Sequence, residues 1–162
     1  MIFPFAISPV NQDERFMLEA LKEAWKAFLK EEVPVGAVLV HEEKIIARGY
    51  NQVEMLNDAT AHAEMLCMTA GEAALENWRL AKTTLYCTIE PCSMCAGAML
   101  LCRVPTLVFG APDIRHGACG SFIDLFSVKH PTHSLEIRKG VLSEFSAKLM
   151  RDFFQKRREQ VE

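Results

Sequence analysis

Two short stretches of the chain carry side chains that complement one another chemically, and they constrain the fold more than any other feature. They are His62-Ala63-Glu64 and Pro91-Cys92-Ser93-Met94-Cys95. Together they supply one imidazole, two thiols and one carboxylate, which are common zinc ligands. A structural zinc uses four protein ligands, whereas a catalytic zinc uses three and leaves one position for water. The count of three, His62, Cys92 and Cys95, therefore predicts a catalytic site that holds one zinc ion per chain.

The spacing within each stretch indicates a different role for the carboxylate. Cys92 and Cys95 are three residues apart, so on one helical turn both sulfur atoms face the same side. Pro91 suits the first position of a helix, whose free N–H groups favour a thiolate. Glu64 lies two residues after His62, and this helical spacing points the two side chains in different directions. We therefore expect Glu64 to act as a base on the water rather than to bind the metal.

Length and composition indicate one soluble globular domain over residues 1–162, with residues 1–10 as an N-terminal extension. Half of the residues are hydrophobic and 24% are charged. The extension is apolar but short, and it contains Pro4 and Pro9. It therefore matches neither a signal peptide nor a membrane span, and we expect a cytoplasmic location without membrane association. The four cysteines outside the motif are predicted to be reduced core residues.

Charge is distributed unevenly along the chain. Residues 1–81 carry 7 basic against 13 acidic side chains, whereas residues 82–162 carry 11 against 8. The basic residues of the second half are densest near its end, at Lys148, Arg151, Lys156, Arg157 and Arg158. This pattern fits either a solvated helix face or a surface that binds a polyanion.

Hydrophobic periodicity predicts an alternation of helices and strands. Helices are expected at 11–31, 62–75, 91–102 and 142–159, and strands at 35–41, 44–48, 83–89, 105–110 and 134–138. Residues 51–59 and 111–121 are expected to be loops, with Asp58 or Thr60 capping the second helix. His62 is expected in the first turn of that helix. This order of elements predicts an α/β fold with a mixed sheet and helices on both faces.

Three other interpretations of the motif compete with a catalytic zinc site. The two fragments could belong to an apolar core by coincidence. Cys92 and Cys95 could instead form a closed zinc site with His130 and His133, although their separation exceeds that of a two-Cys, two-His finger and leaves Glu64 without a role. A thioredoxin-type redox motif also follows a strand at a helix start, but it predicts no His-x-Glu elsewhere.

A His-x-Glu stretch followed by Pro-Cys-x-x-Cys is the signature of zinc deaminases that act on nucleobases. The chain resembles the bacterial tRNA-specific adenosine deaminases of the TadA type, in the cytidine-deaminase-like superfamily. The resemblance covers about residues 13–158 and rests on the stretches 33–37, 49–51, 60–64, 84–86, 90–98, 108–111, 140–142 and 152–154. It implies a three-layer α/β/α sandwich around a central mixed five-stranded sheet. Ala59, Tyr50 and Pro112 depart from the family pattern, where proline, tryptophan and a basic residue are common.

The resemblance assigns substrate contacts as well as the zinc ligands and the proton shuttle Glu64. It implies that the Asn51 side chain and the Ala63 backbone N–H hydrogen-bond the base. Asn51 could equally be a turn residue at the end of a strand. Val35 would form part of the wall of the base pocket, and Asp113 would contact the sugar–phosphate backbone beside the target.

The implied activity is zinc-dependent hydrolytic deamination of the wobble adenosine of a tRNA anticodon to inosine, with the base swung out of its stack. Lys156, Arg157 and Arg158 would bind phosphates of the anticodon stem-loop. The resemblance also implies a homodimer with the 92–102 helix near the partner. Two alternatives stay open: a deaminase of guanine or cytosine, as free base or nucleotide, and an RNA-binding module in which zinc only stabilises the fold.

Overall fold

The computed structural model describes residues 2–160, and helices alternate with strands along most of the chain. The helices are α1 (Gln12–Leu29), α2 (Val53–Leu56), α3 (Ala63–Leu75), α4 (Ser93–Leu101) and α5 (Ser143–Glu159). The strands are β1 (Gly36–His41), β2 (Lys44–Tyr50), β3 (Thr83–Ile89), β4 (Thr106–Ala111) and β5 (Glu136–Lys139). Every helix and strand that the sequence predicts is present. The short helix α2 was not predicted, because it lies in the segment 51–59 that was expected to be loop.

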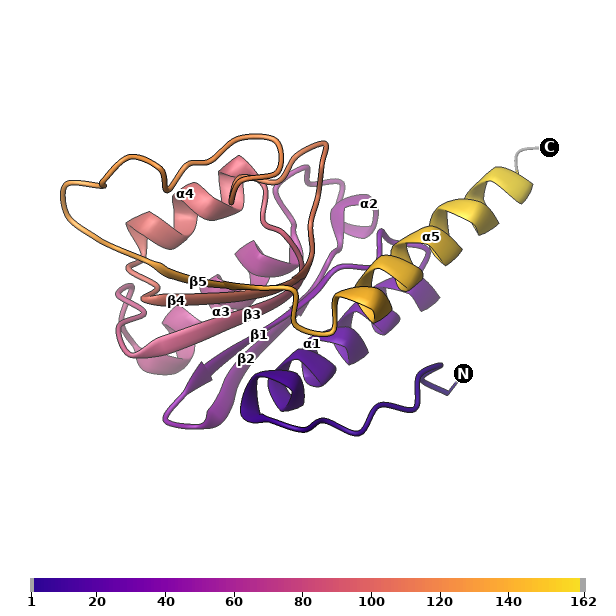
Figure 1. The fold of residues 1–162 in the computed structure, drawn as a ribbon, viewed down its shortest axis with the longest axis horizontal. Helices are drawn as coiled ribbons and strands as arrows, with labels where there is room; N and C mark the ends of the chain where they lie inside the picture. Colours follow the sequence, from indigo (N-terminus) through magenta and orange to yellow (C-terminus); the bar gives the residue numbers. More distant parts are fainter. Residues whose placement is uncertain (1, 161–162) are drawn as a thin grey trace.

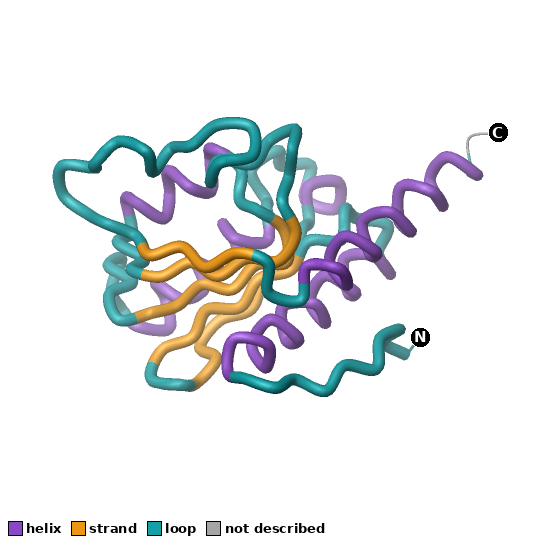
Figure 2. Tube along the Cα trace, viewed as in Figure 1, coloured by secondary structure: helices purple, strands orange, loops and turns teal. Residues whose placement is uncertain are grey.

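The five strands form one mixed sheet in the order β2-β1-β3-β4-β5, which confirms the predicted fold class (Figure 2). β1 pairs antiparallel with β2 and β3, while β3 pairs parallel with β4 and β4 with β5. β1 and β2 are joined by a tight turn whose residues Glu42 and Glu43 have φ angles of 48° and 61°. The parallel pair β3 and β4 needs a crossover connection, and α4 provides it.

Helices cover both faces of the sheet, with α1 and α5 on one face and α3 and α4 on the other (Figure 1). Alternate residues of each buried strand point to opposite faces. In β1, Ala37 and Leu39 pack in the cluster beneath α3 and α4, whereas Val38 and Val40 pack against α1. The sheet is therefore buried on both sides, and in the described part of the chain no helix could span a membrane.

Local signals in the sequence explain where α1 begins. Asn11 caps the helix, because its side chain accepts a hydrogen bond from the backbone N–H of Glu14 at 2.9 Å. Asp13 and Glu14 lie in the first turn, where negative charge favours the helix dipole. Asp13 also joins this helix to the sheet, since it accepts a hydrogen bond from the Tyr86 hydroxyl at 2.8 Å.

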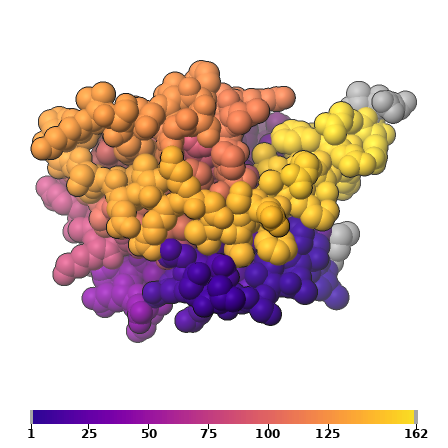
Figure 3. Space-filling view, in the orientation of Figure 1, coloured from indigo at the N-terminus to yellow at the C-terminus, as the bar shows by residue number. Residues whose placement is uncertain are grey.

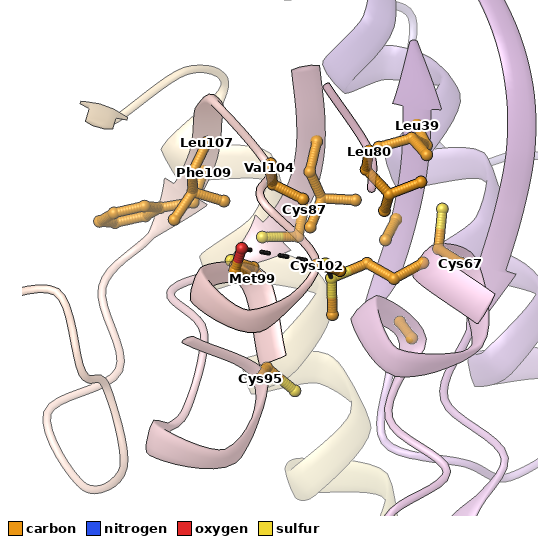
Figure 4. Close-up of a cluster of buried hydrophobic side chains, with 14 of the residues drawn as sticks. Leu39, Cys67, Leu80, Cys87, Cys95, Met99, Cys102, Val104, Leu107 and Phe109 are labelled. Atoms are coloured by element: carbon orange, nitrogen blue, oxygen red, sulfur yellow. Dashed lines mark hydrogen bonds between the residues drawn. The ribbon is translucent and has the colours of Figure 1, made fainter. Parts of the chain in front are cut away.

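The core beneath α3 and α4 is rich in sulfur (Figure 4). The four cysteines outside the metal motif are all buried and free, as predicted: Cys67, Cys87, Cys102 and Cys119. Burial raises the pKa of each of these thiols above its ordinary value. They are therefore held as neutral, unreactive core groups, in contrast to the two cysteines of the motif.

Candidate active site

His62 lies immediately before α3 and is its N-cap residue, with an extended backbone (φ −70°, ψ 152°). The prediction that Asp58 or Thr60 caps this helix is wrong. Asp58 Oδ1 instead accepts hydrogen bonds from the backbone N–H and the hydroxyl of Thr60, at 2.8 and 2.7 Å. This turn closes before α3 begins, so His62 lies at the N-terminus of α3 rather than in its first turn. From this position its imidazole reaches Cys92 and Cys95.

Cys92 occupies the corresponding position on α4, where it is the N-cap residue, and Cys95 lies in the first turn. Pro91 therefore precedes the N-cap and is not the first helical residue, contrary to the prediction. Both sulfur atoms face the same side, because each Sγ lies 3.6 Å from Nδ1 of His62. The starts of two helices that follow different strands thus converge on one point.

Nδ1 of His62 lies at the distance from each cysteine sulfur that a tetrahedral zinc ion requires. Bonds of about 2.3 Å to sulfur and about 2.0–2.1 Å to nitrogen at a tetrahedral angle place N and S about 3.6 Å apart. The observed distance is 3.6 Å for both cysteines, and all three ligand atoms lie within 4.8 Å of one another. The donor set of one imidazole and two thiols also matches the preference of zinc. The residues therefore fit the ion, with one coordination position left for water.

The competing four-ligand site is not formed. His133 Nε2 donates a hydrogen bond to the carbonyl oxygen of Val104 at 2.7 Å, and His130 Nδ1 accepts one from the backbone N–H of Thr132 at 3.3 Å. Within residues 2–160, His62, Cys92 and Cys95 are the only group of three or more His, Cys, Asp or Glu side chains that could hold a metal.

The two motif thiols differ in their affinity for protons. The pKa of Cys92 is lowered to about 4 by hydrogen bonds, first with Cys95 and then with His62, which outweigh desolvation. The adjacent Cys92 sulfur, followed by burial, raises the pKa of Cys95. Hydrogen bonding to Cys92 raises the pKa of His62. A dication bound between these groups would favour loss of both thiol protons and the neutral imidazole.

Glu64 lies in the first turn of α3, with only 4% of its surface exposed. It is not part of the cluster formed by His62, Cys92 and Cys95. Desolvation raises the pKa of its carboxyl group to about 7, against the opposing effects of its own backbone N–H and of His62. A carboxyl group that titrates near neutrality can both accept and return a proton.

Asn51 follows β2 and is joined to the metal-binding segment through the backbone. Its N–H donates to the carbonyl oxygen of Val35 at 3.0 Å, and the N–H of Gln52 donates to that of Ala61 at 3.0 Å. The close approach of α3 to β2 requires Gly49, since a Cβ there would lie 2.4 Å from the carbonyl oxygen of Ala63. The structure thus brings three predicted substrate-binding residues, Val35, Asn51 and Ala63, to the segments around the metal ligands.

Glu90 is a site residue that the sequence analysis missed. Its side chain is 2% exposed and accepts backbone N–H bonds from Asp113, Cys119 and Ser121 at 3.1, 2.9 and 3.1 Å, together with one from the Ser121 hydroxyl. Gly117 lies so close that a Cβ would be 2.4 Å from Glu90 Cδ. Glu90 therefore holds the loop after β4 against the strand end that leads into Cys92. Its place two residues before Cys92 was the only signal in the sequence.

The remaining predicted residues are Asp113, in the loop after β4, and three cations at the end of α5. Asp113 accepts backbone N–H bonds from Arg115 and His116 at 2.9 and 3.2 Å, so Oδ1 of its carboxylate shapes its own loop. Lys156, Arg157 and Arg158 are exposed in the last turn of α5, on the opposite face of the sheet from α3 and α4. These last turns project beyond the body of the molecule (Figures 1 and 3).

Comparison with known proteins places this geometry in a family. Residues 10–111 match the model of the cytidine and deoxycytidylate deaminase zinc-binding region. A tRNA-specific adenosine deaminase of Haemophilus influenzae is 46% identical over 91% of this chain and 86% of its own length. The corresponding protein of Bacillus subtilis is 46% identical over 92% of each. A chloroplastic tRNA(adenine(34)) deaminase of Arabidopsis thaliana is 57% identical over 90% of this chain, which spans 12% of that relative.

Solved structures agree with the sequence comparisons. A structure from a study of A-to-I editing by tRNA:A34 deaminases has a TM-score of 0.80 and 41% identity, and it covers 83% of this chain and 98% of its own. A guanine deaminase of Nitrosomonas europaea has a TM-score of 0.72 at 22% identity, over 93% of this chain and 87% of its own, which shows a common fold. The chain belongs to the cytidine and deoxycytidylate deaminase zinc-binding family and, within it, to the tRNA-specific adenosine deaminases.

Proposed function

We propose that this protein is a zinc-dependent hydrolase that converts the wobble adenosine of a tRNA anticodon to inosine. The observation that carries the proposal is the three-ligand metal site with Glu64 buried beside it, in a chain that belongs to the tRNA-specific adenosine deaminases. A purely structural zinc would need a fourth protein ligand and would leave Glu64 without a role.

The reaction adds water to the amino-bearing carbon of adenine and releases ammonia. Bound zinc would acidify a water molecule and so supply the nucleophile at neutral pH. Glu64 takes one proton from this water and gives it to a ring nitrogen. It then takes the remaining proton of the added hydroxyl group and gives it to the leaving amine, which departs as ammonia. The buried position of Glu64 supports this role, because burial raises the pKa of its carboxyl group and so makes it a stronger base.

Base recognition is assigned to residues around Asn51. The Asn51 side chain and the backbone N–H of Ala63 hydrogen-bond the base, and Val35 forms part of the pocket wall. Ala63 is the first residue of α3, where backbone N–H groups have no acceptor within the helix. Asp113 contacts the sugar–phosphate backbone beside the target.

Docking of the tRNA is assigned to Lys156, Arg157 and Arg158 in the last turn of α5. All three are exposed, and within residues 2–160 no carboxylate forms a salt bridge with them. Lys156 and Arg157 lie over the rings of Phe28 and Phe153, 5.7 and 5.9 Å from the ring centroids. Such cations can bind the phosphates of an anticodon stem-loop.

We further propose that the protein forms a homodimer through α4. The outer face of this helix is apolar, with Leu101 72% exposed and open space around Gly97. Phe122 and Ile123, in the loop after β4, are exposed apolar side chains as well. We also propose a single deaminase domain over residues 1–162, with 1–10 as an extension, that acts in the cytoplasm.

The decisive experiment incubates the zinc-loaded protein with a transcript of a tRNA that carries a wobble adenosine. Nuclease digestion and mass spectrometry should find one inosine per tRNA, at the wobble position only. The Glu64→Gln variant is the matched control, because it should retain the fold and the metal. Release of ammonia from free guanine or cytosine, with no inosine in the tRNA, would assign the protein to a small-substrate deaminase instead.

A further inference from the structure

Glu32 is a buried carboxylate for which neither the metal site nor the sheet provides a role. It follows α1 at a point where Glu31 has a φ of 62°, and this turn directs the next side chain inward. Only 1% of the Glu32 surface is exposed. Within residues 2–160 no Lys, Arg or His side chain pairs with it. A buried carboxylate without a counter-ion must be stabilised by hydrogen-bond donors.

Three donors converge on this carboxylate from the segment after β2. Oε2 accepts the side-chain amide of Asn51 at 3.1 Å and the backbone N–H of Glu54 at 3.3 Å. Oε1 accepts the backbone N–H of Met55 at 2.7 Å. Glu32 thus contacts Asn51, the residue assigned to base recognition. It also accepts backbone N–H groups in the first turn of α2, whose N-cap residue Gln52 makes no side-chain cap bond.

We propose that Glu32 is a positioning residue that fixes which end of the Asn51 carboxamide faces the substrate. This inference rests on the proposed function, in which Asn51 contacts the target base. An ionised carboxylate has only acceptor atoms, so it can pair with Nδ2 of Asn51 but not with Oδ1. Rotation of the amide by half a turn would set two acceptors against each other in a buried site, where such an arrangement is costly.

This constraint determines the pattern of groups that Asn51 offers to a base. One N–H of Nδ2 is held by Glu32, while the second N–H and Oδ1 remain. The backbone of Asn51 is fixed as well, through its bond to the carbonyl oxygen of Val35. One donor beside one acceptor matches the N7 acceptor and N6 amino donor of adenine, the edge that asparagine recognises with two bonds. Guanine presents two acceptors along the same edge, so Oδ1 would oppose its O6.

The substitution Glu32→Gln tests the inference because it replaces one acceptor by a donor at constant size. The new Nε2 can pair with Oδ1 of Asn51 and so permits the reversed amide. We expect kcat/KM on the wobble-adenosine tRNA to fall roughly ten- to a hundredfold, the range for losing a pair of hydrogen bonds to a base. Zinc content should stay at one per chain, and the neighbouring surface variant Glu31→Gln should retain full activity.

A double-mutant cycle separates positioning from a purely structural role. If Glu32 acts through Asn51, Glu32→Gln should add less than about a twofold loss in an Asn51→Ala background. A structural role in holding α2 would multiply the two losses instead, and that result would overturn the proposal. Wild-type activity in the Glu32→Gln variant would overturn it as well. If that variant does not fold, the same cycle is measured with Glu32→Asp, which keeps a carboxylate but shortens its reach.

The cycle also distinguishes failure of this inference from failure of the proposed function. An inactive zinc-loaded wild-type protein on tRNA would refute the function before any variant is compared. An active wild type with independent effects of the two substitutions would leave the function intact and remove Glu32 from base recognition.

Discussion

The metal centre and the last turn of α5 are both assigned to function, but the first is largely buried and the second is exposed. Cys95 and Glu64 are buried, and the metal-site groups are held by contacts between elements far apart in the sequence. Lys156, Arg157 and Arg158 are exposed on one helix and need only its surface. Chemistry in the first region depends on the exact positions of the reacting groups, whereas docking by the second depends on the local positive charge of α5 and on salt concentration. Single substitutions at the metal centre should therefore cause large losses of activity, whereas substitutions in α5 should weaken tRNA binding in small steps.

The largest effect is expected from Cys95→Ala at the metal centre. Two ligands remain, so zinc is held less tightly and the nucleophile is lost with it. Zinc measured by metal analysis should fall well below one per chain, and inosine formation should fall to background. Thermal stability should fall too, because metal binding contributes to folding. Full zinc content in this variant would show that another group completes the site, and the three-ligand assignment would be wrong.

Glu64→Gln should have the next largest effect and should separate chemistry from metal binding. Because Glu64 is assigned to proton transfer only, the variant should keep its zinc and its fold. Its kcat should fall by roughly two to four orders of magnitude, the usual span for losing an acid–base group. Rates are measured in single-turnover reactions, with zinc content determined on the same sample. Loss of zinc would make Glu64 a ligand.

Glu90→Gln tests whether the loop after β4 is held in place by its hydrogen bonds to the buried carboxylate of Glu90. The new amide sets a donor against one of the three backbone N–H groups, which leaves a buried group unpaired. The free energy of unfolding should fall by about 1–3 kcal/mol, measured by urea denaturation of the zinc-loaded protein. The control Glu136→Gln changes a carboxylate that is 63% exposed and pairs with Arg138, so it should have little effect. Equal stability of the two variants would contradict the proposed support of the loop by Glu90.

Neutralising Lys156, Arg157 and Arg158 together should produce the mildest, salt-dependent effect. The slope of log affinity for tRNA against log salt should flatten by up to about 0.9 for each duplex phosphate that the variant no longer neutralises, or about 0.7 in single strands. Single-turnover kcat on bound tRNA and zinc content should not change. Affinity and salt slope are obtained from filter-binding titrations at several salt concentrations.

A matched control removes three exposed cations at the other end of the sheet, Lys44, Arg79 and Lys82. Lys44 pairs with His41 in the β1–β2 hairpin, and Lys82 immediately precedes β3, so both are at the strand ends remote from Cys92. This control has the same net charge as the α5 variant. If both variants lose the same affinity, docking depends on overall charge and not on α5.

Predictions from the sequence were accurate where the information was local. Short apolar and β-branched runs located β1, β3 and β4, and the spacing of His62, Cys92 and Cys95 predicted the metal cluster that the fold assembles. Predictions of helix starts were less accurate, because a cap depends on which turn precedes it. Asp58 and Thr60 are good capping residues by type, yet they bond to each other. The roles of Asn51, Ala63, Val35 and Asp113 stay predictions.

The sequence by itself determined the chemistry of this protein, because ligand type and spacing are properties of short segments. Residue type gave no indication that the side chains of Glu32 and Glu90 are buried, since glutamate is usually a surface residue. Only the tertiary structure decided their roles. Their partners lie 19–23 residues away for Glu32 and 23–31 residues away for Glu90. A buried carboxylate is stable only where such distant N–H groups converge, and that convergence exists only once the sheet and its helices have packed.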